Sequence, residues 1–178
     1  MGIFESKQQL DLICCGLDNS GKSTIINSLK PTKLRSEHIS ATVGFQVEEF
    51  EKGKVNMKVY DMGGAKRFRE MWQTYYNKIQ GIIFVIDSAD KVRMAVVKDE
   101  ITEMIEAGGD ALRGVPILFF ANKMDIPTAF NQQEIVEALE LEELVCDRPW
   151  NIFSSDARRG IGLEEGIQWL QSRITPKS

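Results

Sequence analysis

The chain has 178 residues, of which 43% are hydrophobic and 27% are charged, the composition of a soluble globular protein that can bury one core. We therefore expect a single domain over residues 1–178, with residues 1–9 as a short N-terminal segment. The formal net charge of −4 excludes nucleic acid as a partner, because binding to a phosphate backbone requires a basic face.

The first six residues carry a pattern for lipid attachment. Met1-Gly2-Ile3-Phe4-Glu5-Ser6 matches M-G-x-x-x-[ST], the acceptor pattern for N-myristoylation at Gly2. A chance match is the alternative, because the pattern is short. No apolar run approaches the roughly 20 residues that span a bilayer, and one acyl chain gives only reversible attachment. We therefore predict a cytoplasmic protein that binds a membrane surface peripherally through Gly2.

A phosphate-binding loop follows the first predicted strand. The segment Gly16-Leu17-Asp18-Asn19-Ser20-Gly21-Lys22-Ser23 fills every fixed position of the pattern G-x-x-x-x-G-K-[ST]. An apolar run over residues 10–15 predicts a buried strand before it, and the apolar spacing over residues 24–29 predicts a helix after it. The loop amides would converge on phosphate oxygens, Lys22 would add a positive charge, and Ser23 would ligate magnesium. The predicted nucleotide contacts in this region are Leu17, Asp18, Asn19, Ser20, Gly21, Lys22, Ser23 and Thr24.

An antiparallel hairpin is predicted between residues 44 and 60. Alternating apolar residues stand on both sides of Lys52-Gly53-Lys54, which is a turn signal. The hairpin ends at Asp61-Met62-Gly63-Gly64. An acidic residue leaving a strand tip beside a phosphate loop can hold magnesium through water, and the amide of Gly63 or Gly64, two or three residues later, can reach a terminal phosphate. The alternative for Asp61 is an ordinary turn aspartate.

The segment from Ala65 to Lys78 is basic and aromatic, and it lacks hydrophobic periodicity. Trp72, Tyr75 and Tyr76 lie close together within it. Two interpretations stand for these rings: they pack on the core, or they are exposed as anchors for a protein partner.

Two apolar segments, over residues 81–86 and 115–121, predict central strands of a parallel sheet. The second opens directly into Asn122-Lys123-Met124-Asp125. The carboxylate of Asp125 can accept hydrogen bonds from both the ring amide and the exocyclic amine of guanine. Adenine has no such donor pair, and leaving the carboxylate unpaired costs about 1–3 kcal/mol. Asn122 would tie the base to the phosphate loop, the stem of Lys123 would cover the ring, and GTP would be selected over ATP.

The last third of the chain predicts a helix from residue 132 to about 141, a strand over residues 150–153 and a helix carrying an apolar stripe over residues 163–174. A backbone amide after this strand, within Ser154-Ser155-Asp156, is expected to reach the guanine carbonyl oxygen. Because strands alternate with helices, we predict an α/β fold with a mainly parallel sheet, helices on both faces and the ligand at the carboxyl ends of the strands.

With a phosphate loop and an N-K-x-D segment on one chain, the sequence resembles a small GTPase, and its phosphate loop resembles that of the Arf and Arf-like family. From Leu10 onward, stretches such as GIIFVIDSADKVRM and PILFFANKMD are similar to the Arf-like branch associated with Bardet-Biedl syndrome. The resemblance implies a Ras-like P-loop fold with a six-stranded sheet, GTP or GDP with Mg²⁺ as cofactors, and GTP hydrolysis. For this branch it implies GTP-dependent recruitment of an effector or a BBSome-type coat to membrane, and a location at the cilium or basal body.

The resemblance also implies roles for single residues. Thr42 would meet both the metal and the third phosphate, Ser23 would ligate the metal directly, and Asp61 would hold it through water. Gly64 would donate its amide to the third phosphate, and the hairpin of residues 44–60 would shift register between the GDP and GTP forms. The implied effector surface contains Phe45, Tyr60 and Tyr75, and we add the neighbouring Trp72.

Two departures from the family pattern stand out. The residue after Gly63-Gly64 is usually a glutamine that orients the attacking water, and here it is Ala65. A methyl group cannot hold a water molecule, so we expect slow intrinsic hydrolysis. The N-terminal segment is also shorter than the amphipathic helix typical of the family, so membrane attachment would depend more heavily on the lipid.

Three hypotheses follow. The first is a regulatory GTPase whose product is a conformational state. The second is a GTP-held binding scaffold with no meaningful turnover, which Ala65 favours. The third is a P-loop ATPase or nucleotide kinase, which Asp125 disfavours.

Overall fold

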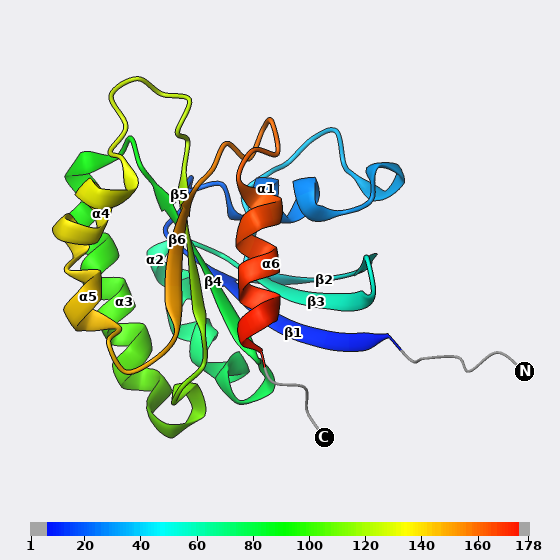
Figure 1. Ribbon diagram of the computed structural model, residues 1–178, viewed down its shortest axis with the longest axis horizontal. Coiled ribbons are helices and arrows are strands. Elements are labelled where there is room, and N and C mark those ends of the chain that lie inside the picture. The colour runs from blue at the N-terminus through cyan, green and yellow to red at the C-terminus, as the bar shows by residue number, and fades with distance from the viewer. Residues whose placement is uncertain (1–6, 175–178) are drawn as a thin grey trace, which may run out of the picture.

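The computed structural model describes residues 7–174 and is organised around a six-stranded sheet with the order β2-β3-β1-β4-β5-β6 (Figure 1). The strands are β1 (Gln8–Cys15), β2 (Phe45–Lys52), β3 (Val55–Met62), β4 (Gly81–Asp87), β5 (Ile117–Asn122) and β6 (Trp150–Ser154). β2 pairs antiparallel with β3, and the remaining pairs are parallel. The predicted α/β fold with a mainly parallel six-stranded sheet is confirmed.

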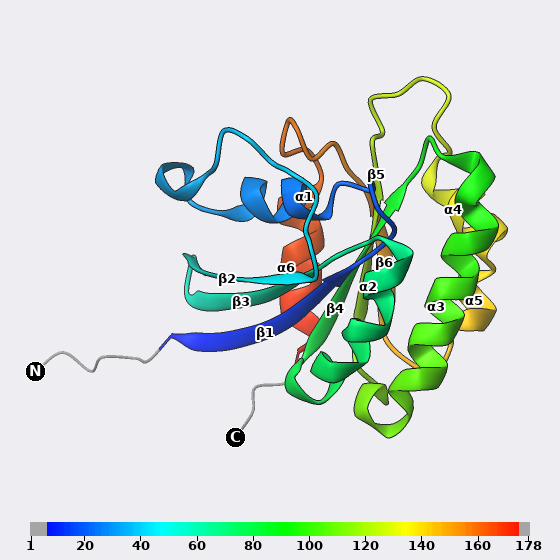
Figure 2. The same cartoon turned by 180° about the vertical axis from the view of Figure 1, so that it is seen from behind.

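Helices cover both faces of the sheet (Figures 1 and 2). On one face lie α1 (Lys22–Leu29) and α6 (Leu163–Arg173), and on the other lie α3 (Met94–Gly108), α4 (Gln132–Leu139) and α5 (Leu141–Leu144). The short helices are α2 (Lys66–Arg69), η1 (Thr32–Leu34), η2 (Glu70–Lys78), η3 (Lys91–Arg93) and η4 (Gly109–Leu112). Within residues 7–174, no helix combines the length and the apolar character needed to cross a bilayer.

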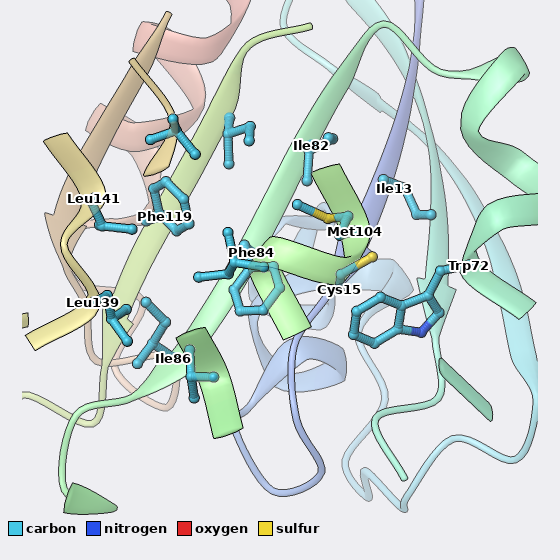
Figure 3. Packing of buried hydrophobic residues seen from close by; sticks show 14 of the residues in the cluster. Ile13, Cys15, Trp72, Ile82, Phe84, Ile86, Met104, Phe119, Leu139 and Leu141 are labelled. Carbon is cyan, nitrogen blue, oxygen red and sulfur yellow. The ribbon is translucent and has the colours of Figure 1, made fainter. Parts of the chain in front are cut away.

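The two faces of the sheet each bury an apolar cluster. β4 and β5 read as continuous apolar runs because both of their faces are covered, and Ile82 to Ile86 are fully buried. Figure 3 shows the cluster beneath α3, in which Phe84 packs between Phe119 and Trp72. On the opposite face, α6 buries the predicted stripe of Leu163, Ile167, Leu170 and Ile174.

Several predicted boundaries need correction. β1 begins at Gln8, so residues of the expected N-terminal segment already pair with β3. The helix expected from residue 132 to about 141 ends at Leu139, because Glu140 adopts a left-handed conformation with φ 51°, and α5 then starts separately. The aromatic segment of residues 65–78 forms α2 and η2. These helices are held by tertiary contacts, so the sequence of the segment shows no hydrophobic periodicity.

The sheet order positions the site. The chain leaves β1 for α1, and the two neighbours of β1 in the sheet are β3 on one side and β4 on the other. In such sheets, a crevice opens at the carboxyl ends of the strands where the strand order reverses. The loop after β1 therefore lies beside the ends of β3, β4 and β5.

Candidate functional site

A cavity of about 740 Å³ lies at the carboxyl ends of the strands, where five separate segments meet. It is lined by the phosphate loop, by residues 39–43 before β2, by Gly64 and Ala65 after β3, by the loop after β5 and by the loop after β6. The predicted residues that line it are Asp18, Asn19, Gly21, Lys22, Ser23, Thr24, Thr42, Gly64, Ala65, Asn122, Lys123 and Asp125. Segments that are far apart in the sequence thus form one site.

The phosphate loop curls because its glycines take backbone conformations that other residues rarely adopt. Gly16 has φ 145° and Gly21 has φ 102°, and Gly21 precedes α1 without a side-chain cap. The first amides of α1 are therefore free to donate to an anion. The side chains of Leu17 and Ser20, two residues of this loop, are buried, so these residues can contact a phosphate only through the main chain.

Lys22 places a buried positive charge inside the loop. Its side chain is only 6% exposed, and its Nζ donates to the carbonyl of Leu17 at 2.8 Å. Burial lowers the pKa of Lys22, although Asp61 and neighbouring groups oppose this effect. A Cβ on Gly64 would lie 2.5 Å from this Nζ, so glycine is required for the chain after β3 to approach the loop. A cation held in a cradle of backbone amides suits a polyphosphate.

Three oxygen-bearing side chains meet beside Lys22. The Ser23 hydroxyl donates to Asp61 Oδ2 at 2.5 Å, and Thr42 Oγ1 lies 2.9 Å from Ser23 Oγ and 3.3 Å from Asp61 Oδ2. Burial raises the pKa of Asp61, although Ser23, Lys22 and Thr42 oppose that rise. Asp61 Oδ1 is buried, and within the described chain it has no hydrogen-bond partner. Hydroxyl and carboxylate oxygens around an orphaned acceptor fit Mg²⁺ and its bound water.

Asp61 differs in one respect from the expectation. It lies within β3, which continues to Met62, and it does not leave the strand at its tip. The strand pairing places Asp61 opposite Cys14 of β1 and Gln46 of β2. The carboxylate is therefore fixed by the sheet and is 2% exposed.

Asn122 ties the base end of the cavity to the phosphate end. Its Nδ2 donates to the carbonyl of Ser20 at 2.9 Å, while its Oδ1 accepts from Ser155 Oγ and from the amide of Ala157, both at 3.1 Å. The link predicted between this residue and the phosphate loop is present. Lys123 lines the cavity with φ 64°, and its Nζ pairs with Asp87 at 2.7 Å. Asp125 lies exposed on the same loop, where it is free to meet a ligand.

The segment after β6 requires a correction. Ser154 and Ser155 do not line the cavity; Asp156, Ala157 and Arg158 do. Ser155 is fully buried, and its hydroxyl supports Asn122 from behind. Of the expected stretch, only Asp156 lines the cavity, and the lining continues to Ala157 and Arg158, at positions that depend on how β6 ends beside β5.

The proposed effector surface also changes. Trp72 is 1% exposed, donates through Nε1 to the carbonyl of Gly63 at 3.3 Å and lies inside the core (Figure 3). Its assignment to an exposed surface is wrong. Tyr60 is 8% exposed beneath Tyr75, whose ring centroid is 4.9 Å away, and Phe45 packs on Tyr75 at 5.0 Å. The lipid position Gly2 lies outside the described residues.

A phosphate loop joined to an N-K-x-D segment across a doubly wound sheet, with a magnesium-type oxygen cluster between them, defines a P-loop guanine-nucleotide-binding protein. The family model that describes the ADP-ribosylation factor family matches residues 1–174. The chain belongs to this family, whose members bind guanine nucleotide with Mg²⁺ and hydrolyse GTP.

Comparison with individual proteins gives the same assignment. The chain is 43% identical to ADP-ribosylation factor-like protein 6 of Danio rerio over 98% of this chain and 97% of the relative. It is 40% identical to the protein of the same name from Caenorhabditis elegans, over 98% and 96%. The Arl6 BBS3 small GTPase of Trypanosoma brucei, solved with the bound nucleotide analogue GppNp, superposes with a TM-score of 0.87 at 50% identity. That match covers 94% of this chain and 99% of the other.

Proposed function

We propose that this protein is a GTP-dependent switch that recruits an effector of the BBSome type to a membrane for ciliary or vesicular protein transport. The observation that carries the proposal is the direct link between the two segments at the third-phosphate end of the cavity. The amide of Gly63 donates to the carbonyl of Gly44 at 2.8 Å, so the segment bearing Thr42 and the segment bearing Gly64 are joined. A third phosphate and its metal would hold both segments, and their loss would release both.

Next to this link, an apolar surface lies at the start of β2. Val43 is 74% exposed, Val47 is 41% exposed and Phe45 is 37% exposed, with Tyr75 half-buried next to them. Apolar residues exposed together are typical of an interaction site. Because Phe45 follows Gly44 in the chain, this surface would be ordered when GTP is bound and would be lost when GDP is bound. The likeness of the whole chain to the Arl6 proteins supports an effector of the kind that the family branch uses.

Slow hydrolysis is the first testable consequence, because Ala65 lines the cavity beside Gly64 and has no group that can hold a water molecule. Replacing Ala65 with glutamine is expected to raise the single-turnover rate of GTP hydrolysis about 10- to 100-fold, since one positioned hydrogen bond is worth roughly 1.5–3 kcal/mol. Release of phosphate from preloaded protein measures this rate. Ala95→Gln, on the exposed side of α3, is the matched control and should leave the rate unchanged. A parental rate in Ala65→Gln would contradict the assignment.

A second candidate is a GTP-held scaffold that never turns over, and the same alanine favours it. The two candidates differ in what a partner does. An activating protein that supplies the missing water-positioning group would raise phosphate release from the switch, whereas release from a scaffold would stay at the background rate with every cell fraction added.

Membrane attachment is proposed to depend on an acyl chain at Gly2, in a protein that acts at the cilium or basal body. Protein acylated at Gly2 should sediment with lipid vesicles, whereas unmodified protein should sediment poorly with either GTP or GDP bound, because one acyl chain supplies most of the affinity. A Gly2→Ala variant passed through the same acylation reaction is the control. Equal sedimentation of the acylated and unmodified proteins would defeat this proposal.

A further inference from the structure

Arg93 joins the start of α3 to the phosphate loop, although it does not line the cavity. Its Nη1 donates to Asp18 Oδ1 at 2.7 Å, and its Nη2 donates to the carbonyl oxygen of Asp18 at 2.8 Å. Its Nε donates to Asp90 Oδ2 at 2.6 Å, so the guanidinium is itself anchored. A planar fork with several donors can hold a carboxylate and a carbonyl at once, which a lysine cannot do. Asp18 is therefore fixed through both its side chain and its main chain.

Asp18 occupies the end of the cavity where a third phosphate would lie. Its amide donates to the carbonyl of Gly64 at 3.1 Å. A Cβ on Gly64 would lie 2.5 Å from the Asp18 nitrogen and 2.5 Å from Lys22 Nζ, so these three groups converge. The Asp18 side chain is 48% exposed, so in the absence of Arg93 it would be free to turn toward the cavity. A carboxylate in that position would repel a further negative charge.

We infer that Arg93 is a positioning residue that holds the Asp18 carboxylate away from the third phosphate and thereby sets the preference of the pocket for GTP over GDP. The inference rests on the third-phosphate end assigned in the proposed function. GDP ends one phosphate earlier, so a released Asp18 carboxylate would oppose GTP much more than GDP. Partial burial alone raises the pKa of Asp18, but the hydrogen bond and charge of Arg93 outweigh it and hold that pKa below its usual value. Asp18 is thus an ionised group whose charge is already paired.

The test compares the affinities for two nucleotides in three variants. Arg93→Gln is expected to lower the ratio of affinity for a non-hydrolysable GTP analogue to affinity for GDP by about tenfold, both measured with Mg²⁺. Adding Asp18→Asn to the same chain should bring the ratio back to within about threefold of the parent, because the double variant no longer has a carboxylate to release. Arg93→Lys, which keeps the charge but loses the fork, should give an intermediate ratio.

Arg113→Gln is the matched control. Arg113 also pairs with an aspartate, Asp110, at 2.6 Å, but it is 81% exposed and lies beyond the C-terminal end of α3, whereas Arg93 lies at its start, so the ratio should not change. If Arg93 had a purely structural role, Arg93→Gln would weaken the binding of both nucleotides equally, and adding Asp18→Asn would not restore it. That outcome, or an unchanged ratio in Arg93→Gln, would overturn the inference. A parent protein that binds neither nucleotide would instead overturn the proposed function together with it.

Discussion

Replacing Asp125 with asparagine is expected to change the base preference of the protein from guanine to xanthine. Xanthine keeps the ring amide of guanine but carries a carbonyl oxygen where guanine has its exocyclic amine. The asparagine oxygen would accept from the ring amide, and its NH₂ group would donate to the new carbonyl. With GTP, the exocyclic amine of guanine would meet the asparagine NH₂ group, and both are hydrogen-bond donors. This mismatch costs about 1–3 kcal/mol, which is roughly a 5- to 150-fold loss of affinity.

The measurement is a competition between GTP and XTP for the parent and the variant. Asp125 is exposed on the loop after β5, so the substitution should leave the thermal unfolding temperature unchanged. Asp110→Asn is a suitable control because Asp110 is also exposed but lies on η4, outside the cavity. A variant that still prefers GTP over XTP would show that another group reads the base.

Replacing Lys22 with alanine is expected to abolish tight binding of every nucleotide, whatever its base. Two unit charges 4 Å apart attract by about 4 kcal/mol at an effective dielectric constant near 20, so even a discounted contribution corresponds to a loss on the order of 100-fold. The variant should purify without nucleotide, and titration with fluorescent GDP and GTP should show the loss for both. This result differs from that of Asp125→Asn, which changes the base and keeps the polyphosphate contacts.

The folded state should tolerate this second change. Burial lowers the pKa of Lys22, which means that the folded protein holds its ammonium group at a cost when no phosphate is present. Lys98→Ala, which removes a surface lysine paired with Glu140 on α4's C-terminal cap, is the control for loss of a positive charge. Binding of GTP by Lys22→Ala at parental affinity would place the polyphosphate elsewhere.

Local patterns were sufficient for much of the site. The phosphate loop and the N-K-x-D segment could be recognised because each is a short run in which residue type and backbone geometry are coupled, such as glycine at positive φ. The central strands were equally accessible, since burial on both faces demands an unbroken apolar run. The magnesium cluster was reached only in part. Ser23 and Asp61 could be proposed from their local patterns and Thr42 from the family resemblance, whereas the distances between them required the pairing of β1 with β3.

Other features depended on contacts between distant parts of the chain. The sequence leaves Trp72 open between the core and an exposed effector surface, and α2 and η2 place it in the core against Phe84. The segment after β6 presents Ala157 to the cavity and Ser155 to the interior, because Ser155 pairs through its amide with Ala121 of β5. No local period distinguishes these neighbouring positions.

By itself, the sequence determined the fold class, the phosphate loop and the choice of guanine, since each depends on residues that are adjacent in the chain or repeat at a regular spacing. Only the tertiary structure decided which backbone faces the base, which aromatic rings reach the surface and that Arg93 holds Asp18, a residue 75 positions earlier. The physical reason is that such contacts arise where separate strands end side by side, and the order of strands in the sheet, not the order of residues, sets which groups meet there.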